Sequence, residues 1–403
     1  MDRVTDSVRA FYEAYPYPAG EQVDCDGYQV ELLLSYRERQ GVPMRPLQVL
    51  EAGCGRGLNL QAAAAAQPHV RFTGIDVNRV AIDEARRAAA HKGLDNLQFQ
   101  TADLMQRSSL PETPGGYDLI LSYGVIHHLS DPQLGFSQLD DLLSPQGLVA
   151  LMVDGRFGRQ PLDRFLQALR LLAEESDSAD QRLSEARALA RVAEQALFRG
   201  TYWQGTAEVN DVEFADRCLH VHERSYSVQE LCYHLDFSGL RFLRWLEPSD
   251  WRFTELEKDP ALGPLIARLD PLQRYGLIER LFERPKLTLL AMPAGAMSRL
   301  PLEPAAVAST QFRLNPQLKR YQNHSDELHW QLRRQSPAPA MSACAEAILQ
   351  AADAMSEAFS GEQMIEHLHQ RGFPRQQARQ SLCQLEADEW LYRPHPGTSG
   401  EGR

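Results

Sequence analysis

The stretch Leu50-Glu51-Ala52-Gly53-Cys54-Gly55-Arg56-Gly57 stands between a short apolar run, Leu47–Leu50, and a helix-like run, Leu58–Ala66. Glycines there allow a tight turn with positive φ and a close approach of the backbone to a ligand. The start of the following helix offers free N–H groups that favour a negative or polar partner. Because such a loop also fits a dinucleotide site or a plain turn, the residues around it decide its role.

Three acidic residues adjoin the ends of three successive predicted strands. Glu51 precedes the glycines, where a carboxylate can meet an ammonium group and where a phosphate-binding loop has no use for negative charge. Asp76 ends the second strand and can accept both hydroxyls of a ribose. Asp103 follows the third strand and suits the exocyclic amine of adenine. Each acid alone is typical of a helix cap, but together they predict a site for a cationic, amine-bearing cofactor.

Short apolar runs alternate with helical stretches from residue 47 to residue 153. Besides Leu47–Leu50, the predicted strands are Arg71–Asp76, Leu97–Gln100, Tyr117–Ser122, Gly147–Val153, Leu240–Leu246 and Lys286–Met292. The predicted helices between the first three strands are Leu58–Ala66 and Arg79–Lys92. This order predicts an α/β fold of the Rossmann-like kind, with a seven-stranded, mostly parallel sheet.

The segments outside this core have other patterns. Residues 1–45 predict an aromatic helical cap, and residues 155–225 a helical insertion above the carboxyl ends of the strands, where open sheets bind ligands. The insertion is either a lid over the substrate or an extra helical layer without ligand contact. The proline-rich residues 294–335 predict a linker. Residues 336–403 predict a small, mainly helical module, with a winged-helix-like arrangement as one interpretation.

Composition limits the classes of function. The 403 residues carry a net charge of −12, which disfavours nucleic acid as a partner. The chain shows neither a basic start followed by an apolar run nor about 18 consecutive apolar residues, so neither a signal peptide nor a membrane span is expected. The six cysteines form no C-x-x-C pair, which is typical of reduced thiols and predicts a cytoplasmic protein.

Residues 45–155 resemble the class I S-adenosylmethionine-dependent methyltransferases, of the type described as methyltransferase domain 12 or 25. Glu51-x-Gly53-x-Gly55-x-Gly57 is similar to the first motif of that family, Asp76 and Asp103 stand at the second and third, and Asp118–Leu129 is similar to the fourth strand. The resemblance implies a methyltransferase domain over residues 46–293 and S-adenosyl-L-methionine as cofactor. The implied cofactor-binding residues are Glu51, Gly53, Cys54, Gly55 and Gly57 for the methionine portion, Asp76 and Val77 for the ribose, Asp103 and Leu104 for the adenine, and Ser122, Tyr123 and Gly124 beside the methyl donor.

Two further segments are similar to a bacterial subgroup of that family. Phe11–Pro18 is similar to a Y-E-x-x-P-Y-P pattern, and Asp216–Val228 to a D-x-x-L-H-P-x-x-R-x-Y-T-V pattern, in which Ser227 keeps the hydroxyl of a helix N-cap. Because an aromatic face attracts a sulfonium cation, Tyr17 is expected to close over the cofactor together with Tyr12 and Tyr15. An aromatic helix that packs on the edge of the sheet is the alternative.

Methyl transfer is an in-line displacement that depends mainly on proximity and alignment. A neutral amine acceptor needs only to arrive deprotonated, whereas a hydroxyl or carbon acid benefits from a base. The candidate catalytic residues are His127, His128, His220 and Tyr226. For His127 and His128 the alternative is that one of them only caps or packs. The Cys218-x-His220-x-His222 pattern is not expected to bind a metal, because alternate residues on an extended segment rarely do.

Two interpretations of the whole chain remain open. In the first, the acceptor is a small molecule enclosed under the helical insertion. In the second, the acceptor is a protein or peptide that residues 336–403 dock. A homodimer is compatible with either. The three acidic residues argue against a protein that binds the cofactor only for interaction.

Overall fold

The computed structural model describes residues 2–20, 29–37, 45–172, 178–252, 254–322, 328–332, 341–355 and 357–394. The chain divides into two compact units. The first consists of Met1–Tyr28, Gly41–Leu246 and Trp251–Ala296, and the second of Gln29–Gln40, Glu247–Asp250 and Met297–Arg403. The predicted cap over residues 1–45 is therefore not one piece, because residues 29–40 belong to the second unit.

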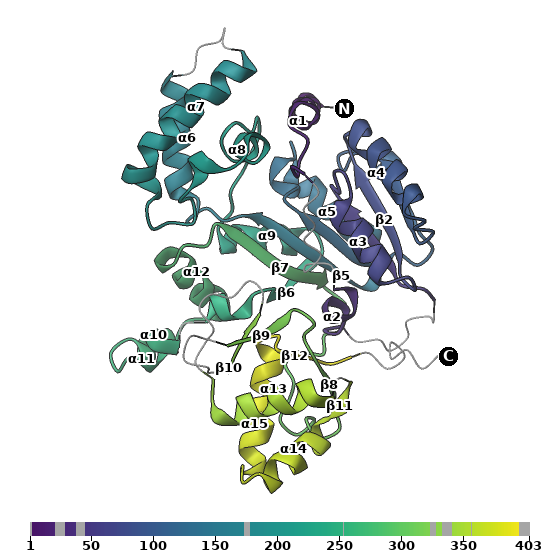
Figure 1. Ribbon diagram of the computed structural model, residues 1–403, viewed down its shortest axis with the longest axis vertical. Helices are drawn as coiled ribbons and strands as arrows, with labels where there is room; N and C mark the ends of the chain where they lie inside the picture. Colours follow the sequence, from purple (N-terminus) through teal and green to yellow (C-terminus); the bar gives the residue numbers. More distant parts are fainter. Residues whose placement is uncertain are drawn as a thin grey trace. The chain divides into compact units, whose positions relative to one another are not determined.

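The first unit is built on one seven-stranded sheet (Figure 1). Its strands are β1 (Gln48–Ala52), β2 (Arg71–Asp76), β3 (Leu97–Thr101), β4 (Tyr117–Tyr123), β5 (Leu143–Asp154), β6 (Leu240–Trp245) and β7 (Lys286–Pro293), in the order β3-β2-β1-β4-β5-β7-β6. Neighbours from β3 to β5 pair in parallel, whereas β7 is antiparallel to both β5 and β6. The predicted Rossmann-like, mostly parallel sheet is confirmed.

Helices cover the sheet, and α4, α5, α9 and α12 begin at side-chain caps. They are α3 (Leu58–Ala66), α4 (Arg79–His91), α5 (Pro132–Leu142), α9 (Val228–Phe237) and α12 (Pro271–Leu281), with the short α10 (Thr254–Lys258) and α11 (Gly263–Ile266) before the last of them. Ser227 caps α9 in a capping box with Glu230, as its hydroxyl predicts. Val49, Leu50 and Leu119 are fully buried, as expected for strands covered on both faces.

A helical insertion separates β5 from α9, as predicted for residues 155–225. It contains α6 (Gln160–Leu172), α7 (Ala179–Ala193), the short helices η4 (Glu194–Phe198) and η5 (Thr206–Glu208), and α8 (Asp211–Cys218). The insertion has its own apolar core, in which Phe165, Phe198 and Phe214 are buried. The N-terminal helix α1 (Arg3–Ala14) begins at Asp2, whose carboxylate accepts hydrogen bonds from the amides of the first turn and from Ser130 Oγ at 2.8 Å.

The second unit is mixed rather than purely helical. Its elements are α2 (Val30–Leu34), β8 (Gln311–Leu314), β9 (Leu318–Gln322), β10 (Leu328–Leu332), α13 (Ala343–Met355), β11 (Phe359–Ser360), α14 (Gly361–Gln370), α15 (Arg375–Ala387) and β12 (Leu391–Tyr392). Strands β11 and β12 flank β8, and β9 pairs with β10. Phe312 and Trp330, which lie in the segment predicted to be a linker (294–335), are buried in one core with α13–α15. The last elements follow one another in the order α13-β11-α14-α15-β12, and the winged-helix-like interpretation stays a prediction.

Candidate functional site

The glycine loop after β1 is held in a conformation that favours glycine. The φ angles of Gly53, Gly55 and Gly57 are 80°, 52° and 63°. The amides of Gly53 and Cys54 both donate to the carbonyl of Ile75, at 2.8 and 2.9 Å, which ties the loop to the end of β2. Side chains would not fit, because a Cβ built on Gly53 lies 2.2 Å from Cγ2 of Val125. The loop is therefore a close-packed backbone turn at the carboxyl end of β1.

The acidic residues lie where the sequence places them, at the ends of successive strands. Asp76 accepts hydrogen bonds from the amides of Gly55 and Asn78, both at 2.8 Å, and burial raises the pKa of its carboxyl. Asp103 is 5% exposed, and its Oδ1 accepts from the amide of Met105 at 2.8 Å. Asp103 Oδ2 is buried without a hydrogen-bond partner among the described residues. This atom is available to a ligand that brings a donor, as an adenine amine does.

The remaining cofactor candidates surround the same loop. Glu51 and Ser122 are buried at the ends of β1 and β4, and Ser122 Oγ has no hydrogen-bond partner in the described ranges. Gly124 has φ 75° and donates its amide to Met152 at 3.0 Å. Cys54 and Leu104 are buried, and Val77 and Tyr123 are half-buried. The structure thus collects the predicted set around the glycine turn, and its open oxygens fit the amine and hydroxyl groups of an adenosyl ligand.

Tyr17 joins this group through its backbone. Its carbonyl oxygen lies 3.2 Å from the Cβ position of Gly55, so residue 17 crosses the glycine loop. Its side chain is half-exposed, and burial together with nearby acids raises the pKa of its hydroxyl. The backbone of Tyr17 therefore lies against the proposed cofactor loop, and the closing of its ring over the cofactor stays a prediction.

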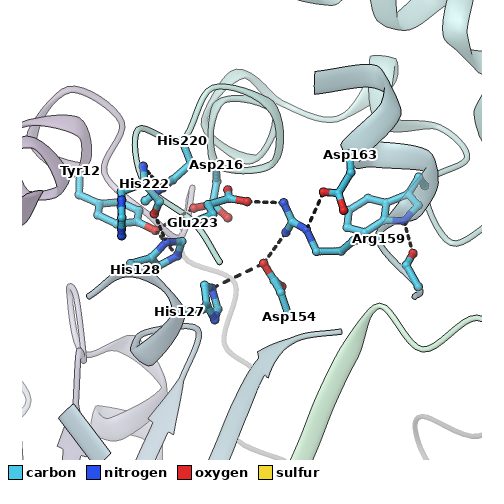
Figure 2. A network of polar contacts seen from close by, with 12 residues as sticks. Tyr12, His127, His128, Asp154, Arg159, Asp163, Asp216, His220, His222 and Glu223 are labelled. Carbon is cyan, nitrogen blue, oxygen red and sulfur yellow. Dashed lines mark hydrogen bonds and ion pairs between the residues drawn. The ribbon is translucent and has the colours of Figure 1, made fainter. Parts of the chain in front are cut away.

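Three of the four candidate catalytic residues form one cluster (Figure 2). His127 and His128 end the short helix η3 (Ile126–His128) that follows β4, and the ring of His128 stacks on that of His220, with centroids 3.8 Å apart. Tyr12 of α1 donates its hydroxyl to Asp216 Oδ1 of α8 at 2.9 Å, and the same hydroxyl lies 3.5 Å from His128 Nε2. The cluster thus joins α1, η3 and the end of the insertion.

A buried ion network borders the histidines. Arg159, at the start of α6, pairs with Asp154 at the end of β5 and with Glu223 in the loop after α8 (Figure 2). Its Nε lies 3.7 Å from Asp163 Oδ1, and Asp154 Oδ2 lies 3.7 Å from His127 Nε2. Arg159 thereby connects the sheet, the insertion and the histidine cluster.

Burial sets the protonation states in this cluster. It lowers the pKa of His127 to about 3 and that of His220 to about 2, and it also lowers the pKa of His128, so all three imidazoles are neutral at pH 7. It raises the pKa of Asp216 to about 6, although the Tyr12 hydrogen bond opposes the shift. It raises the pKa of Glu223 to about 8, against the guanidinium of Arg159. Neutral histidines can each offer one donor and one acceptor.

The structure does not bring Tyr226 into this cluster. Its side chain is fully buried in the apolar core with Val228 and Leu231, and its ring packs edge-on against His234 at 5.7 Å. Its amide donates to the carbonyl of Asp154 at 2.8 Å, so its backbone extends β5 while its ring turns into the core. The polar pattern of residues 216–228 does not reveal this turn.

Sequence reasoning missed Asp154, Arg159 and Glu223. Asp154 follows the fifth strand as Asp76 and Asp103 follow theirs, so the same rule could have found it. The sequence carries no comparable signal for Arg159, because its partners lie 5 and 64 residues away and meet only in the folded chain.

The fold and the site define a known class of protein, and comparisons with known proteins agree. Residues 50–149 match the family described as "Methyltransferase domain". An uncharacterized protein of Synechococcus sp. is 28% identical over 292 residues, which cover 70% of this chain and 69% of that protein. An uncharacterized methyltransferase of Bacillus subtilis is 28% identical over 42% of this chain and 63% of its own length.

Among solved structures, PKMT2 from Rickettsia typhi in complex with AdoHcy has a similar fold. The TM-score is 0.70 at 17% sequence identity, and the match covers 94% of this chain and 77% of that one. The chain is a class I S-adenosylmethionine-dependent methyltransferase, with the methyltransferase domain at residues 50–149. None of the helices among the described residues is long and apolar enough to cross a membrane.

Proposed function

We propose that S-adenosylmethionine binds at the glycine loop and that its methyl group is transferred to an acceptor held at the cluster of Tyr12, His128 and His220. The main support for this proposal is that two chain segments run from the glycine loop to the cluster. Val125, which packs on Gly53, lies three residues before His128, and Tyr17, which crosses Gly55, lies five residues after Tyr12. A methyl donor on the loop would therefore lie beside the cluster.

In this proposal the protein residues bind and orient. Glu51 meets the ammonium of the methionine portion, Asp76 the ribose hydroxyls, and Asp103 Oδ2 the adenine amine. Bound S-adenosylmethionine supplies an activated methyl group on a sulfonium centre, and alignment provides much of the acceleration. Excluding water from a buried site strengthens the polar contacts that hold the acceptor.

The charge of the cluster favours an amine as the acceptor group. The carboxyl groups of Asp154, Asp163 and Glu223 contact Arg159, and Asp216 lies near Asp154 and Glu223. Carboxyl groups attract a cationic or hydrogen-bond-donating group and disfavour an anion. The ring of Tyr12 adds an aromatic face, which also suits a cation.

The enclosure of the cluster favours a small acceptor. Helix α1 covers the histidines on one side, since Phe11 packs on His220 with centroids 4.9 Å apart, and α8 covers them on another through Asp216. A small molecule under the insertion fits this arrangement. A protein or peptide whose narrow side chain reaches the cluster is the second candidate, and the whole-chain fold shared with PKMT2, second unit included, favours it.

Calorimetry with S-adenosylmethionine tests the cofactor site. Asp76→Ala should weaken binding about 10- to 100-fold, because hydrogen bonds to a charged group contribute about 1.5–3 kcal/mol. Asp83→Ala, an acid on the outer side of α4 that pairs with Arg86, is the matched control and should bind as the wild type does. Equal affinity of wild type and Asp76→Ala would contradict the assignment.

An acceptor screen with methyl-labelled cofactor tests the second half of the proposal. The enzyme is incubated with fractionated metabolites and, separately, with a protein fraction freed of small molecules. Label in a low-molecular-weight amine supports the small-molecule acceptor. Label found only in polypeptides overturns that choice in favour of the protein acceptor, and label on a hydroxyl or carbon overturns the amine.

A further inference from the structure

The backbone of residues 222–224 holds all three histidines of the cluster. The amide of His222 donates to His220 Nδ1 at 3.1 Å, and the carbonyl of His222 lies 2.9 Å from His128 Nδ1. The amide of Arg224 donates to the carbonyl of His127 at 3.0 Å. Two residues, His222 and Arg224, thus fix the orientation of two imidazole rings and the backbone of a third histidine.

These contacts give the two stacked histidines opposite tautomers. A carbonyl can only accept, so His128 Nδ1 carries the proton and its Nε2 keeps a lone pair, directed toward the Tyr12 hydroxyl at 3.5 Å. A backbone amide can only donate, so His220 Nδ1 keeps the lone pair and the proton is on Nε2. His220 Nε2 is buried and has no hydrogen-bond partner among the described residues. The cluster therefore presents a hydrogen-bond acceptor atom on one ring and a hydrogen-bond donor on the ring stacked against it.

The side chain of Glu223 anchors this three-residue segment to Arg159. Arg159 is held in turn by Asp154 on β5 and lies 5.7 Å from the ring centroid of Trp203, and its own side chain is only 7% exposed. A planar guanidinium with several donors can hold two carboxyl groups in fixed directions, which a lysine ammonium does not do. Arg159 is therefore one anchor of the 222–224 backbone, beside the bond from the Arg224 amide to His127 and the bond from Arg156 to the carbonyl of Ser225.

We infer that Arg159 is a positioning residue for methyl transfer. It acts through Glu223 to hold the 222–224 backbone, which makes His128 Nε2 a hydrogen-bond acceptor and His220 Nε2 a hydrogen-bond donor toward the molecule that receives the methyl group. The inference rests on the proposed function for its role in the reaction, but the tautomers themselves can be measured without turnover.

Nitrogen-15 spectra of histidine-labelled full-length protein test the inference, with signals assigned through His128→Gln and His220→Gln. The wild type should show His128 protonated at Nδ1 and His220 at Nε2. Arg159→Gln should lose this fixed pattern, and its kcat should fall about 10- to 100-fold, since a displacement of about 1 Å can cost that much. Its KM for S-adenosylmethionine should stay within about twofold.

Arg187→Gln is the matched control. Arg187 is another partly buried arginine of the insertion, bonded to the carbonyls of Ala207 and Val209 and to Asp211, without a contact to the histidines. It should lower the melting temperature but leave the tautomers and kcat unchanged. Glu223→Gln keeps an oxygen for Arg159 and should retain the tautomers, whereas Glu223→Ala should lose them.

Two results would overturn the inference. One is a folded Arg159→Gln protein with wild-type tautomers and a kcat within about twofold. The other is an equal loss in Arg187→Gln, which would indicate a general effect on the insertion. If Arg159→Gln does not fold, Glu223→Gln and Glu223→Ala provide the test, and wild-type tautomers in Glu223→Ala would overturn the inference. A wild type that methylates no acceptor would contradict the proposed function, while the spectra would still decide the positioning.

Discussion

Replacing Gly53 with alanine tests how tightly the glycine loop packs against the segment that leads to the histidines. The new Cβ would lie 2.2 Å from Cγ2 and 3.0 Å from Cγ1 of Val125, at a φ of 80°. Two costs follow. A side chain in the left-handed region costs about 1–2 kcal/mol. Forcing Val125 aside costs about 1–3 kcal/mol more, as in other overpacked sites.

A second substitution separates the two costs. Val125→Ala removes both Cγ atoms and leaves its Cβ at 3.2 Å, so Gly53→Ala in that background should cost only about 1–2 kcal/mol. A double-mutant cycle of these two substitutions should therefore give a coupling free energy of about 1–3 kcal/mol between residues 53 and 125.

Urea denaturation read by hydrogen exchange of β1 and β4 peptides measures these free energies for the first unit alone. The two single variants, the double variant and the wild type complete the cycle. Effects that add within about 0.5 kcal/mol would refute the reasoning, since independent sites add to that degree. Val125 would then not lie on the loop, and the proposed closeness of cofactor and cluster would lose its main support.

Three further predictions concern other parts of the molecule. Burial raises the pKa of Asp216 to about 6, so the free energy of unfolding should fall by about 1.4 kcal/mol per pH unit as the pH rises from about 4 to about 6. The free energy of unfolding of Asp216→Asn should lack this slope, and equal slopes in the two proteins would contradict the raised pKa. Ser227→Ala should cost about 1 kcal/mol by removing the cap of α9, whereas Ser227→Thr should cost less, and a chemical denaturation series that shows equal losses would count against the capping box. Glu386→Gln should destabilise the second unit by about 3–5 kcal/mol, because it leaves Arg393 buried without its carboxylate partner; thermal unfolding measures the loss, and a drop of less than about 1 kcal/mol would show that the pair is not needed.

The parts of the fold that local patterns encode were predictable from the sequence. Short runs rich in apolar residues, alternating with helical stretches, marked the strands up to β5, since burial and turn chemistry act over a few residues. The glycine loop, Asp76 and Asp103 were predictable for the same reason: each stands at a strand end, and parallel strands bring those ends to one edge of a sheet.

The parts that depend on distant contacts were not predictable. Strands β8–β10 are short and lie among prolines, and they are stable only because Phe312 and Trp330 share a core with α13–α15. Deleting residues 336–403 to test partner docking would therefore expose that core rather than remove an independent module. The Arg159 network was not predictable either, because its residues come from elements that meet only in the folded chain.

The turn between β5 and the insertion is packed tightly against the residues that precede β7. A Cβ on Gly155 would lie 2.1 Å from the carbonyl oxygen of Arg284, one on Gly158 2.2 Å from the same backbone, and the amide of Gly155 donates to Pro285. The insertion is thus fastened at its root. Helix α1 is held by its buried Val8 and Phe11 as well as by the bonds from Ser130 to Asp2 and from Tyr12 to Asp216. Both elements that cover the histidine cluster are therefore anchored by more than one kind of contact.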